Sequence, residues 1–473
     1  EIGWCDWSSD VCSSDLTDTI AAIATPHGTA STGLIRVSGP EAGELAKQLF
    51  RPSRPGCEWL SHHLYHGDLL AGDGITLLDE ALVTLMRGPH SFTGEDVLEI
   101  SCHGNPLILK SILERLMELG CRPARPGEFT QRAFLNGRMD LSQAEALATL
   151  ICAQSEKARR IGLEQLKGSL GCRIGELRSM LIDAMAMLEV LIDFGEDVPP
   201  EDVPKPQMLI AQARKEFESL LSTCRQAKFI TAGFEAIIIG KPNVGKSSLL
   251  NALASKKKAI VTDIPGTTRD LITETIDING LVVRLTDTAG LRDPQDAIEK
   301  EGIDLVLENL ELADAVLIVL DGSKPLTSED MDILKRNKNY AQRAVIAVNK
   351  CDLPPAWTPR QLPEPYSSGV DTLSISAKFG DGLDGLKKKL ANMAGHNEQQ
   401  DGSVIITQLR HKLSLEKALA RAGAAVECLE AQQSPEFAAF ELHQAIEALD
   451  EITGKVIQDD VLDKIFSTFC IGK

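Results

Sequence analysis

Residues 240–247 constrain the fold of this chain more than any other segment. They read G-K-P-N-V-G-K-S and fit the pattern G-x-x-x-x-G-K-[ST]. Residues 235–239 predict a short buried strand before this run, and residues 248–254 predict the start of a helix with one apolar face after it. A glycine-rich turn that joins a strand to a helix in this way is typical of a phosphate-binding loop.

The loop predicts specific contacts with a nucleoside triphosphate. Its glycines let backbone N–H groups turn toward phosphate oxygens, and Lys246 can reach the β- and γ-phosphates. The Ser247 hydroxyl can ligate Mg²⁺. The alternative, a chance glycine-rich turn, is disfavoured by the flanking strand and helix. The nucleotide contacts expected from this part of the chain are Asn243, Val244, Gly245, Lys246, Ser247 and Ser248.

A second motif, D-x-x-G, follows residues 281–286, which predict a strand. The motif consists of Asp287, Thr288, Ala289 and Gly290. Its aspartate can hold Mg²⁺ through a water molecule, and its glycine N–H can meet the γ-phosphate. Binding and hydrolysis of the nucleotide are therefore expected to share one pocket.

Two later motifs indicate the base. The apolar run 344–348 predicts a strand that leads into Asn349, Lys350, Cys351 and Asp352. The Asp352 carboxylate can accept from the N1–H and 2-amino groups of guanine, which adenine does not offer. Ser376, Ala377 and Lys378 follow a predicted strand at residues 372–375 and are expected to close over the base edge. The four motifs in this order predict GTP as the nucleotide.

The first switch of such a GTPase is expected at residues 264–270, between the phosphate loop and D-x-x-G. Thr268 is the predicted Mg²⁺ ligand there, together with Ser247. Leu291 stands where Ras-type enzymes carry a water-orienting glutamine. Since leucine cannot orient water, another group must do so for hydrolysis. The side-chain oxygen of Asn243 can help to coordinate a monovalent cation, whose charge would replace that of an arginine finger.

Composition sets the frame around this site. The chain has 473 residues and 43% hydrophobic content, enough for about three domains with packed cores. It contains no apolar run of membrane-spanning length, about 18 residues. Its 11 cysteines form no C-x-x-C pair, which predicts a reduced, cytoplasmic setting. The formal net charge of −19 argues against a large basic surface for nucleic acid.

Residues 1–16 differ in character from the rest of the chain. They contain two near-copies of one tetrapeptide, W-S-S-D and C-S-S-D, and lack the basic and apolar regions of a signal peptide. We expect a non-native arm whose deletion leaves folding and activity intact, and the alternative is a genuine short disordered arm.

Residues 17–135 mix short β-like runs with one helix-like stretch, a pattern that predicts an α+β domain. The expected strands and helix lie at residues 20–24, 33–37, 81–86 and 97–101, and at residues 107–119.

The pattern changes to long helices over residues 136–232. Apolar residues recur there at spacings of three and four and predict one continuous packed stripe, formed by Leu163, Leu166, Leu170, Ile174, Leu177, Leu181 and Leu188. Helices are expected again at residues 408–429 and 437–452, with Gly454 as a C-terminal stop. The predicted domains are therefore a helical domain in two parts, 136–232 and 398–473, and a nucleotide-binding domain inserted between them at 233–397.

The chain resembles the MnmE (TrmE) family of tRNA-modification GTPases. In the middle of the chain the resemblance rests on G-K-P-N-V-G-K-S-S, T-D-I-P-G-T-T-R-D, D-T-A-G-L-R, N-K-C-D and S-A-K. Elsewhere it rests on S-F-T-G-E-D-V-L-E-I-S-C-H-G, R-P-G-E-F-T-Q-R-A-F-L-N-G-R-M-D-L and the terminal F-C-I-G-K. The resemblance covers residues 18–473 and implies an N-terminal α+β folate-binding domain, a discontinuous α-helical domain and an inserted Ras-like P-loop G domain, all within a multidomain α/β and α chain.

The family implies a homodimer held by its N-terminal domains, whose G domains pair face to face when K⁺ and GTP are present. The matching K⁺ positions are Asn243, Thr262, Ile264 and Thr267, and the switch threonines among them also belong to the expected nucleotide contacts. Glu299 matches a carboxylate that orients the hydrolytic water through a second water. Without the resemblance, a solvated acidic helix start is an equal alternative for Glu299. The expected catalytic residues are Glu299, Lys246, Thr268 and Asp287.

The positions that match the family's folate site are Arg36, Glu99, Arg138 and Lys473. The cations suit the anionic tail or formyl oxygen of a tetrahydrofolate derivative, 5-formyl or 5,10-methylene, and the carboxylate suits the donor edge of a pterin. Taken alone, each residue is more often part of a surface ion pair. The family places Cys470 near the folate as a redox-active or nucleophilic thiol, and the alternative is an ordinary buried cysteine at a helix end.

The reaction implied is installation of an aminomethyl or carboxymethylaminomethyl group at C5 of the wobble uridine of certain tRNAs. A flavoprotein partner, MnmG, would supply the FAD and NADH chemistry and carry most of the tRNA.

Two alternative functions stay open at this point. A ribosome-assembly GTPase of the Era or Der kind shares G-T-T-R-D, but should carry a basic RNA-binding domain where helices follow here. A GTP-driven conformational switch without chemistry of its own is the other.

Overall fold

The computed structural model describes residues 18–54, 56, 58–194, 205–231, 233–254, 272–278, 280–287, 310–311, 313–394 and 404–472. The chain divides into two compact units, Glu1–Ala148 with Asp450–Lys473 and Thr149–Leu449. The C-terminal residues thus belong to the same unit as the N-terminal ones. The division into domains at residues 135, 232 and 397 stays a prediction.

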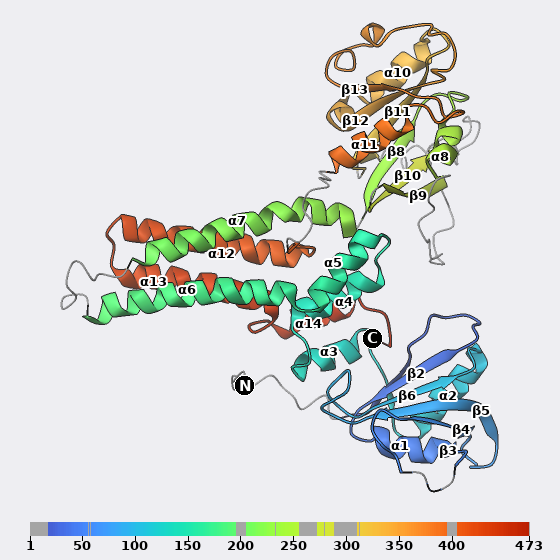
Figure 1. Ribbon diagram of the computed structural model, residues 1–473, viewed down its shortest axis with the longest axis vertical. Helices are drawn as coiled ribbons and strands as arrows, with labels where there is room; N and C mark the ends of the chain where they lie inside the picture. Colours follow the sequence, from blue (N-terminus) through green and yellow to red (C-terminus); the bar gives the residue numbers. More distant parts are fainter. Residues whose placement is uncertain are drawn as a thin grey trace. The chain divides into compact units, whose positions relative to one another are not determined.

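The first unit is built on a sheet that has seven strands among the described residues, in the order β3-β4-β5-β6-β2-β1-β7. Neighbouring strands run antiparallel, except that β1 and β7 are parallel (Figure 1). The strands are β1 (Ile20–Ile23), β2 (Gly33–Ser38), β3 (Phe50–Pro52), β4 (Leu64–Leu70), β5 (Leu77–Met86), β6 (Val97–Cys102) and β7 (Arg122–Pro123).

One face of this sheet carries the apolar core. In β2, Ile35 and Val37 are fully buried against the helices α1 (Ala42–Leu49) and α2 (Pro106–Glu118). Helix α2 forms because Asn105 caps its first turn, Pro106 suits its first position, and its apolar residues recur every three or four positions. Since strand side chains alternate between faces, Arg36 lies on the other face of the sheet.

The other face is where the C-terminal segment of the chain returns. Helix α14 (Asp459–Phe466) contacts α3 (Glu128–Leu135), and its Leu462 and Phe466 share an apolar cluster with Leu141 of α4 (Leu141–Ile151). Gly454 has φ 85° and ends the preceding helix, which confirms the predicted stop.

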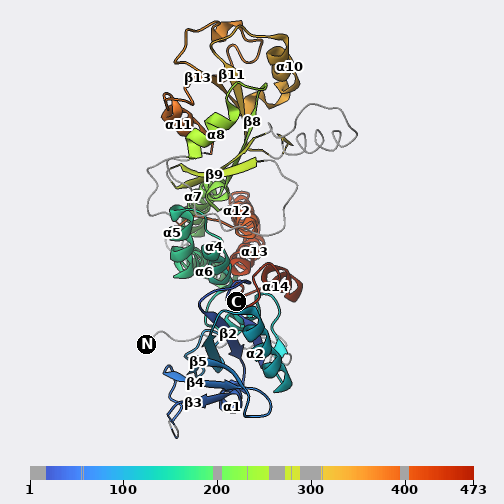
Figure 2. The same ribbon diagram turned by 90° about the vertical axis from the view of Figure 1, so that its right-hand side faces the viewer.

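The second unit contains a set of long helices. They are α5 (Glu156–Leu166), α6 (Ser169–Phe194), α7 (Pro206–Thr231), α12 (Leu409–Glu430) and most of α13 (Pro435–Thr453), whose last turn belongs to the first unit. Helix α7 contacts both α6 and α12, although α7 and α12 are separated in sequence by the whole nucleotide-binding part (Figures 1 and 2). The predicted discontinuous helical domain is therefore confirmed as a fold.

The predicted continuous stripe is wrong at one point. The stripe is divided between two helices, because α5 ends at Leu166 and Gly168, with φ 89°, turns the chain before α6. Helix α5 buries Ala158 and Ile161, whereas the predicted Leu163 and Leu166 are only half-buried. The remaining members, from Leu170 to Leu188 on α6, are fully buried as predicted.

The nucleotide-binding part has a six-stranded sheet in the described residues, ordered β13-β12-β11-β8-β10-β9. Its strands are β8 (Phe234–Ile239), β9 (Ile272–Ile278), β10 (Leu281–Asp287), β11 (Ala315–Asp321), β12 (Ala344–Asn349) and β13 (Asp371–Ser374). All pairs are parallel except β9 with β10. The strand β11 is buried at every residue, as expected for a parallel sheet covered on both faces.

Helices cover the two faces of this sheet. Helices α8 (Lys246–Ala254) and α11 (Leu383–Met393) pack on one face, and α10 (Ser328–Arg336) contributes Leu334 to the core on the other. Two 3-10 helices complete this part, η3 (Lys338–Arg343) and η4 (Pro359–Gln361). The expected fold class, an α+β domain, a discontinuous helical domain and a Ras-like P-loop domain, is confirmed. Among the described residues, no helix is sufficiently long and apolar to span a bilayer.

Candidate functional site

The phosphate-binding loop lies between β8 and α8 and has a shape that excludes side chains at two positions. A Cβ atom at Gly240 would lie 2.4 Å from the Val319 carbonyl oxygen, and one at Gly245 would lie 2.3 Å from Asn349 Nδ2. Asn243 adopts φ 63° between them, a conformation that asparagine tolerates better than most residues. The loop can therefore form a backbone cradle for the phosphates of a nucleoside triphosphate.

Lys246 brings its charge into this cradle. The lysine is 6% exposed, and its Nζ donates to the carbonyl oxygens of Gly240 at 2.6 Å and Lys241 at 2.9 Å. Because Lys246 also begins α8, its ammonium and the backbone N–H groups of the first helical turn lie at the same end of the loop.

The phosphate loop and the segment that begins at Ser376 meet at Asn349, which is 3% exposed at the end of β12. Its Nδ2 donates to the Val244 carbonyl oxygen at 2.8 Å, and its Oδ1 accepts from the Ala377 N–H at 2.9 Å. Ser376 Oγ donates to Asp352 Oδ1 at 2.7 Å, which orients the carboxylate. The predicted base-recognition residues are thus brought together beside the phosphate loop.

Asp321 is a site residue that the sequence predictions missed. It ends β11, and its Oδ2 accepts from Lys350 Nζ at 2.7 Å, while the same ammonium donates to the Asn243 carbonyl oxygen at 3.3 Å. Burial would raise the pKa of Asp321, but hydrogen bonds from Lys350 and Ser323 outweigh burial and hold that pKa below its usual value. Its position at a strand end, like that of Asn349, is the signal that could have found it.

A second missed pair joins the phosphate loop to α10. Lys241 Nζ donates to Asp330 Oδ2 at 2.7 Å, and Asp330, 2% exposed, forms the capping box of α10 with Thr327. Burial would raise the pKa of Asp330, but the hydrogen bonds from Lys241 and Thr327 keep it lowered. The T-x-x-D pattern before a helix could have indicated the cap, although not its contact with the loop.

Several predicted site residues lie outside the described part of the chain. Asp287 ends β10 beside Ile238 of β8, so its backbone is at the correct edge of the sheet, but its side chain is not described. The others outside the described residues are Thr262, Ile264, Thr267, Thr268, Thr288, Ala289, Gly290, Leu291, Glu299 and Lys473. Of the predicted Mg²⁺ pair, Ser247 is described and is exposed at the start of α8.

A separate candidate site lies on the face of the first unit's sheet to which the C-terminal segment returns. Arg36 of β2 is in register with Glu99 of β6, and its Nε and Nη2 donate to Glu99 Oε1 at 2.9 and 2.7 Å. The guanidinium carbon lies 5.4 Å from the ring centroid of Phe92 and 5.8 Å from that of Phe129. These two rings were not among the predicted site residues, although both stand in motifs that carry the resemblance, Phe92 in S-F-T-G-E-D-V-L-E-I-S-C-H-G and Phe129 in R-P-G-E-F-T-Q-R-A-F-L-N-G-R-M-D-L.

The C-terminal segment reaches the same site. Arg36 Nη1 donates to the Gly472 carbonyl oxygen at 3.3 Å. Gly472 has φ 91°, and a Cβ there would lie 2.6 Å from the Ile23 carbonyl oxygen, so glycine permits this close approach. The structure thus brings Arg36, Glu99 and Gly472 together.

Cys470 and Arg138 lie in the same region. The Cys470 carbonyl accepts from Gly127 N–H at 3.5 Å, but the cysteine is exposed, so its alternative interpretation as a buried cysteine is wrong. Arg138 is exposed beside the loop that carries Phe92, since a Cβ on Gly94 would lie 3.4 Å from Arg138 Cγ. The half-buried ring of Phe92, one carboxylate and two arginines suit a flat anionic ligand, whereas the ring of Phe129 is fully buried in the core.

Comparison with known proteins gives consistent matches for both units. A model of the MnmE helical domain matches residues 141–470, and a model of the GTP-binding protein TrmE N-terminus matches residues 19–138. The tRNA modification GTPase MnmE of Syntrophus aciditrophicus is 47% identical over 462 residues, 97% of this chain and 100% of that protein.

Two further relatives agree with this match. The tRNA modification GTPase MnmE of Geobacter metallireducens is 41% identical, with 97% of this chain and 100% of that protein covered. The protein of the same name in Heliobacterium modesticaldum is 42% identical, with 96% and 99% covered. The solved G domain of a T. maritima FeoB iron transporter is 26% identical and covers 34% of this chain and 98% of its own, but its TM-score of 0.27 is too low to support an argument.

Proposed function

The chain belongs to the MnmE (TrmE) family of tRNA modification GTPases, and on this premise we propose how its two sites serve that activity. The chain hydrolyses GTP at the loop of residues 240–247 and acts in tRNA modification. In the proposed reaction, with a flavoprotein partner, MnmG, it modifies C5 of the wobble uridine of certain tRNAs. A tetrahydrofolate derivative bound near Arg36 supplies the one-carbon unit, and the FAD and NADH chemistry takes place in the partner.

The observation that carries the GTP-binding part of this proposal is the convergence of motifs on Asn349. That side chain joins the phosphate loop to the segment that begins at Ser376, and Ser376 orients the Asp352 carboxylate for the donor edge of guanine. The positive Lys246 ammonium partly neutralises the negative charge of the phosphates. Mg²⁺, held by Ser247 and Thr268, would add positive charge at the phosphate oxygens that bear the developing negative charge.

The proposed potassium dependence rests on Asn243 and on residues outside the described part of the chain. Asn243 would hold K⁺ with Thr262, Ile264 and Thr267, and Glu299 would orient the hydrolytic water in place of the glutamine that Leu291 replaces. The test compares GTP hydrolysis in KCl and NaCl for the wild-type chain and for Glu299→Ala. We expect faster hydrolysis in KCl, and a Glu299→Ala chain that binds GTP normally but turns it over slowly. Equal rates in both salts would remove the potassium proposal.

The proposed folate site is supported by the chemistry around Arg36. Both Arg36 bonds to Glu99 end on Oε1, and we assign Oε2 to the donor edge of a pterin, which the half-buried ring of Phe92 can flank. We expect 5-formyltetrahydrofolate to raise the melting temperature of the chain. The change Glu99→Gln should abolish that shift, whereas Asp68→Asn, which alters a surface pair with Arg51 on the same sheet, should preserve it.

Modification itself needs a test in cells. Mass spectrometry of wobble uridines from a deletion strain complemented by this chain would measure the product directly. Complementation by the wild-type chain and its loss with Cys470→Ser, at unchanged GTP hydrolysis, would support a chemical role for the thiol. If Cys470→Ser keeps both the modified uridine and GTP hydrolysis, the thiol has no chemical role. Size-exclusion chromatography with and without MnmG tests the proposed homodimer and its complex.

A further inference from the structure

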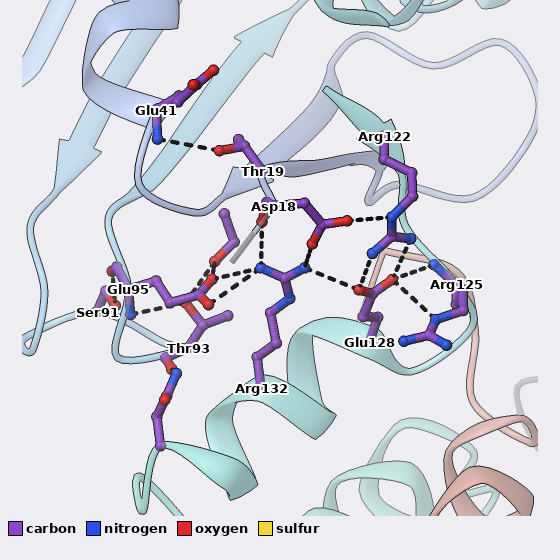
Figure 3. A network of polar contacts seen from close by, with 12 residues as sticks. Asp18, Thr19, Glu41, Ser91, Thr93, Glu95, Arg122, Arg125, Glu128 and Arg132 are labelled. Carbon is purple, nitrogen blue, oxygen red and sulfur yellow. Dashed lines mark hydrogen bonds and ion pairs between the residues drawn. The ribbon is translucent and has the colours of Figure 1, made fainter. Parts of the chain in front are cut away.

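An ionic cluster with a fully buried centre lies at the start of α3 (Figure 3). We call it the Arg132 network, and its members are Asp18, Glu95, Arg122, Glu128 and Arg132. Arg132 and Glu128 are both 0% exposed. Glu128 accepts from Arg122 Nη2 at 2.6 Å through Oε1, and from the Arg125 N–H at 2.7 Å through Oε2. Charges buried to this extent persist only when all of them are paired.

Arg132 is the member that joins three separate segments. Its Nη1 donates to the Asp18 carbonyl oxygen at 2.8 Å and to the Glu95 carboxylate at 3.2 Å. Its Nη2 donates to Asp18 Oδ1 at 2.6 Å and to Glu128 Oε1 at 3.0 Å. A planar guanidinium can serve these acceptors at once, whereas a lysine ammonium offers one nitrogen on a flexible stem.

Two of these three segments carry the rings that contact Arg36. Phe129 directly follows Glu128 in α3, and Phe92 belongs to the loop that ends at Glu95. That loop is held further by Ser38 Oγ, which donates to Glu95 Oε2 at 2.6 Å and lies 2.7 Å from Thr93 Oγ1. Figure 3 shows Glu95 and Glu128 on opposite sides of the Arg132 guanidinium. Arg132 belongs to the same helix as Phe129, so its bond to Glu95 ties that helix to the loop of Phe92, next to the bond that Asn136 Nδ2 donates to the Thr93 carbonyl oxygen at 2.7 Å.

We propose that Arg132 is a positioning residue for the ligand site at Arg36. Arg132 and Glu128 share α3, so by binding Glu95 as well as Glu128 the guanidinium ties the loop of Phe92 to the helix of Phe129 and keeps both rings within 6 Å of Arg36. The Phe129 ring is fully buried and supports Arg36 from within the core, whereas Phe92 is only half-buried and is the ring that a ligand can contact. Arg132 itself lies in the buried network and acts through these two segments. The identity of the ligand as a tetrahydrofolate derivative rests on the proposed function, but the positioning of the rings does not.

The first test measures ligand affinity in the full chain. We expect Arg132→Lys to weaken binding of 5-formyltetrahydrofolate by about tenfold or more in calorimetry, because the bridge between the two segments is lost. The matched control is Ile112→Ala, which truncates a fully buried side chain of α2 on the opposite face of the sheet. The control should lower the melting temperature and leave the affinity unchanged. Wild-type affinity in Arg132→Lys, or an equal loss in Ile112→Ala, would overturn the proposal.

The second test measures the environment of the two phenylalanine rings in the absence of ligand. Fluorine NMR of chains labelled with 4-fluorophenylalanine, with signals assigned by Phe92→Leu and Phe129→Leu, reports the surroundings of both rings. We expect both signals to move in Arg132→Lys and to stay in place in Ile112→Ala. Unmoved signals would refute the positioning role. If the wild-type chain binds no folate, the proposed function fails, and the fluorine signals still decide the inference.

A third variant covers the case in which Arg132→Lys does not fold. Glu95→Gln removes only the carboxylate charge that the loop of Phe92 contributes to the network. The Glu95 side chain is 17% exposed, so the fold tolerates this change better than a change of the fully buried Arg132. We expect it to move the Phe92 signal more than the Phe129 signal. Equal movement of both, or of neither, would count against the proposed bridge.

Discussion

The Asn349 side chain donates to the Val244 carbonyl oxygen at 2.8 Å, although the two residues are 105 positions apart in sequence. The same side chain accepts from the Ala377 N–H, so one amide sets the distance between the phosphate loop and the base-recognition segment. Because Asn349 is almost fully buried, both of its hydrogen bonds form in a site that water does not compete for. This single residue therefore links the two halves of the nucleotide site.

The change Asn349→Ala should weaken GTP binding. Removal of the amide leaves the Val244 carbonyl and the Ala377 N–H without their partner, which costs about 2 kcal/mol, or roughly 30-fold in affinity. Dissociation of a fluorescent guanine nucleotide measures the loss. The control is Asn337→Ala. Asn337 Nδ2 donates to the Ile333 carbonyl oxygen of α10 and does not bond to the phosphate loop. Equal affinities in the two variants would contradict the linking role.

The change Asp352→Asn should alter base selectivity. A carboxylate accepts from both N–H donors of guanine, whereas an amide presents one donor and one acceptor and suits the 2-carbonyl of xanthine. We expect GTP hydrolysis to fall and xanthosine triphosphate hydrolysis to rise, at an unchanged melting temperature. A variant that loses both activities equally would show that Asp352 serves the fold of the loop instead.

The pair of Lys241 with Asp330 should stabilise the phosphate loop. Asp330→Asn keeps an oxygen for the helix cap but removes the charge opposite Lys241, and we expect a loss of about 1.5–3 kcal/mol in unfolding free energy. Faster nucleotide release should accompany it, because the loop loses its tie to α10. A double-mutant cycle with Lys241→Met isolates the pair. Additive effects of the two changes would show that the pair contributes nothing.

Acid should destabilise the first unit through the Arg132 network. Hydrogen bonding from Arg122 lowers the pKa of Asp18, and for Glu128 burial raises the pKa but the bonds from Arg122, Arg125 and Arg132 outweigh it. A carboxyl with a lowered folded-state pKa contributes stability above its unfolded pKa, about 4, and that stability disappears as pH falls through the lower folded value.

Urea unfolding between pH 7 and pH 3, which gives the unfolding free energy of the first unit at each pH, measures this effect. The wild-type chain should lose stability steeply at the acid end, and Glu128→Gln should start less stable at pH 7 but lose less on acidification. Parallel pH curves for the two chains would contradict the prediction.

The nucleotide site was largely predictable because its information is local. Each motif follows an apolar strand within a few residues, so the strand-turn-helix order shows where Gly245, Asn349 and Ser376 must lie on a parallel sheet. Asp321 and Asp330 were missed because their importance comes from Lys350 and Lys241, which reach them from other strands and loops. The break between α5 and α6 was missed because a single glycine can interrupt a stripe without changing its spacing.

The sequence by itself determined the family, the fold class and the order of the motifs that bind GTP. Only the tertiary structure decided that Arg36 meets Phe92, Phe129 and, 436 residues away, Gly472. The register of β2 with β6 and the return of the chain after α14 fix these contacts, and neither leaves a periodic trace in the sequence. The physical reason is that local spacing specifies a loop, whereas a site shared by distant segments depends on how buried faces and buried charges find their partners.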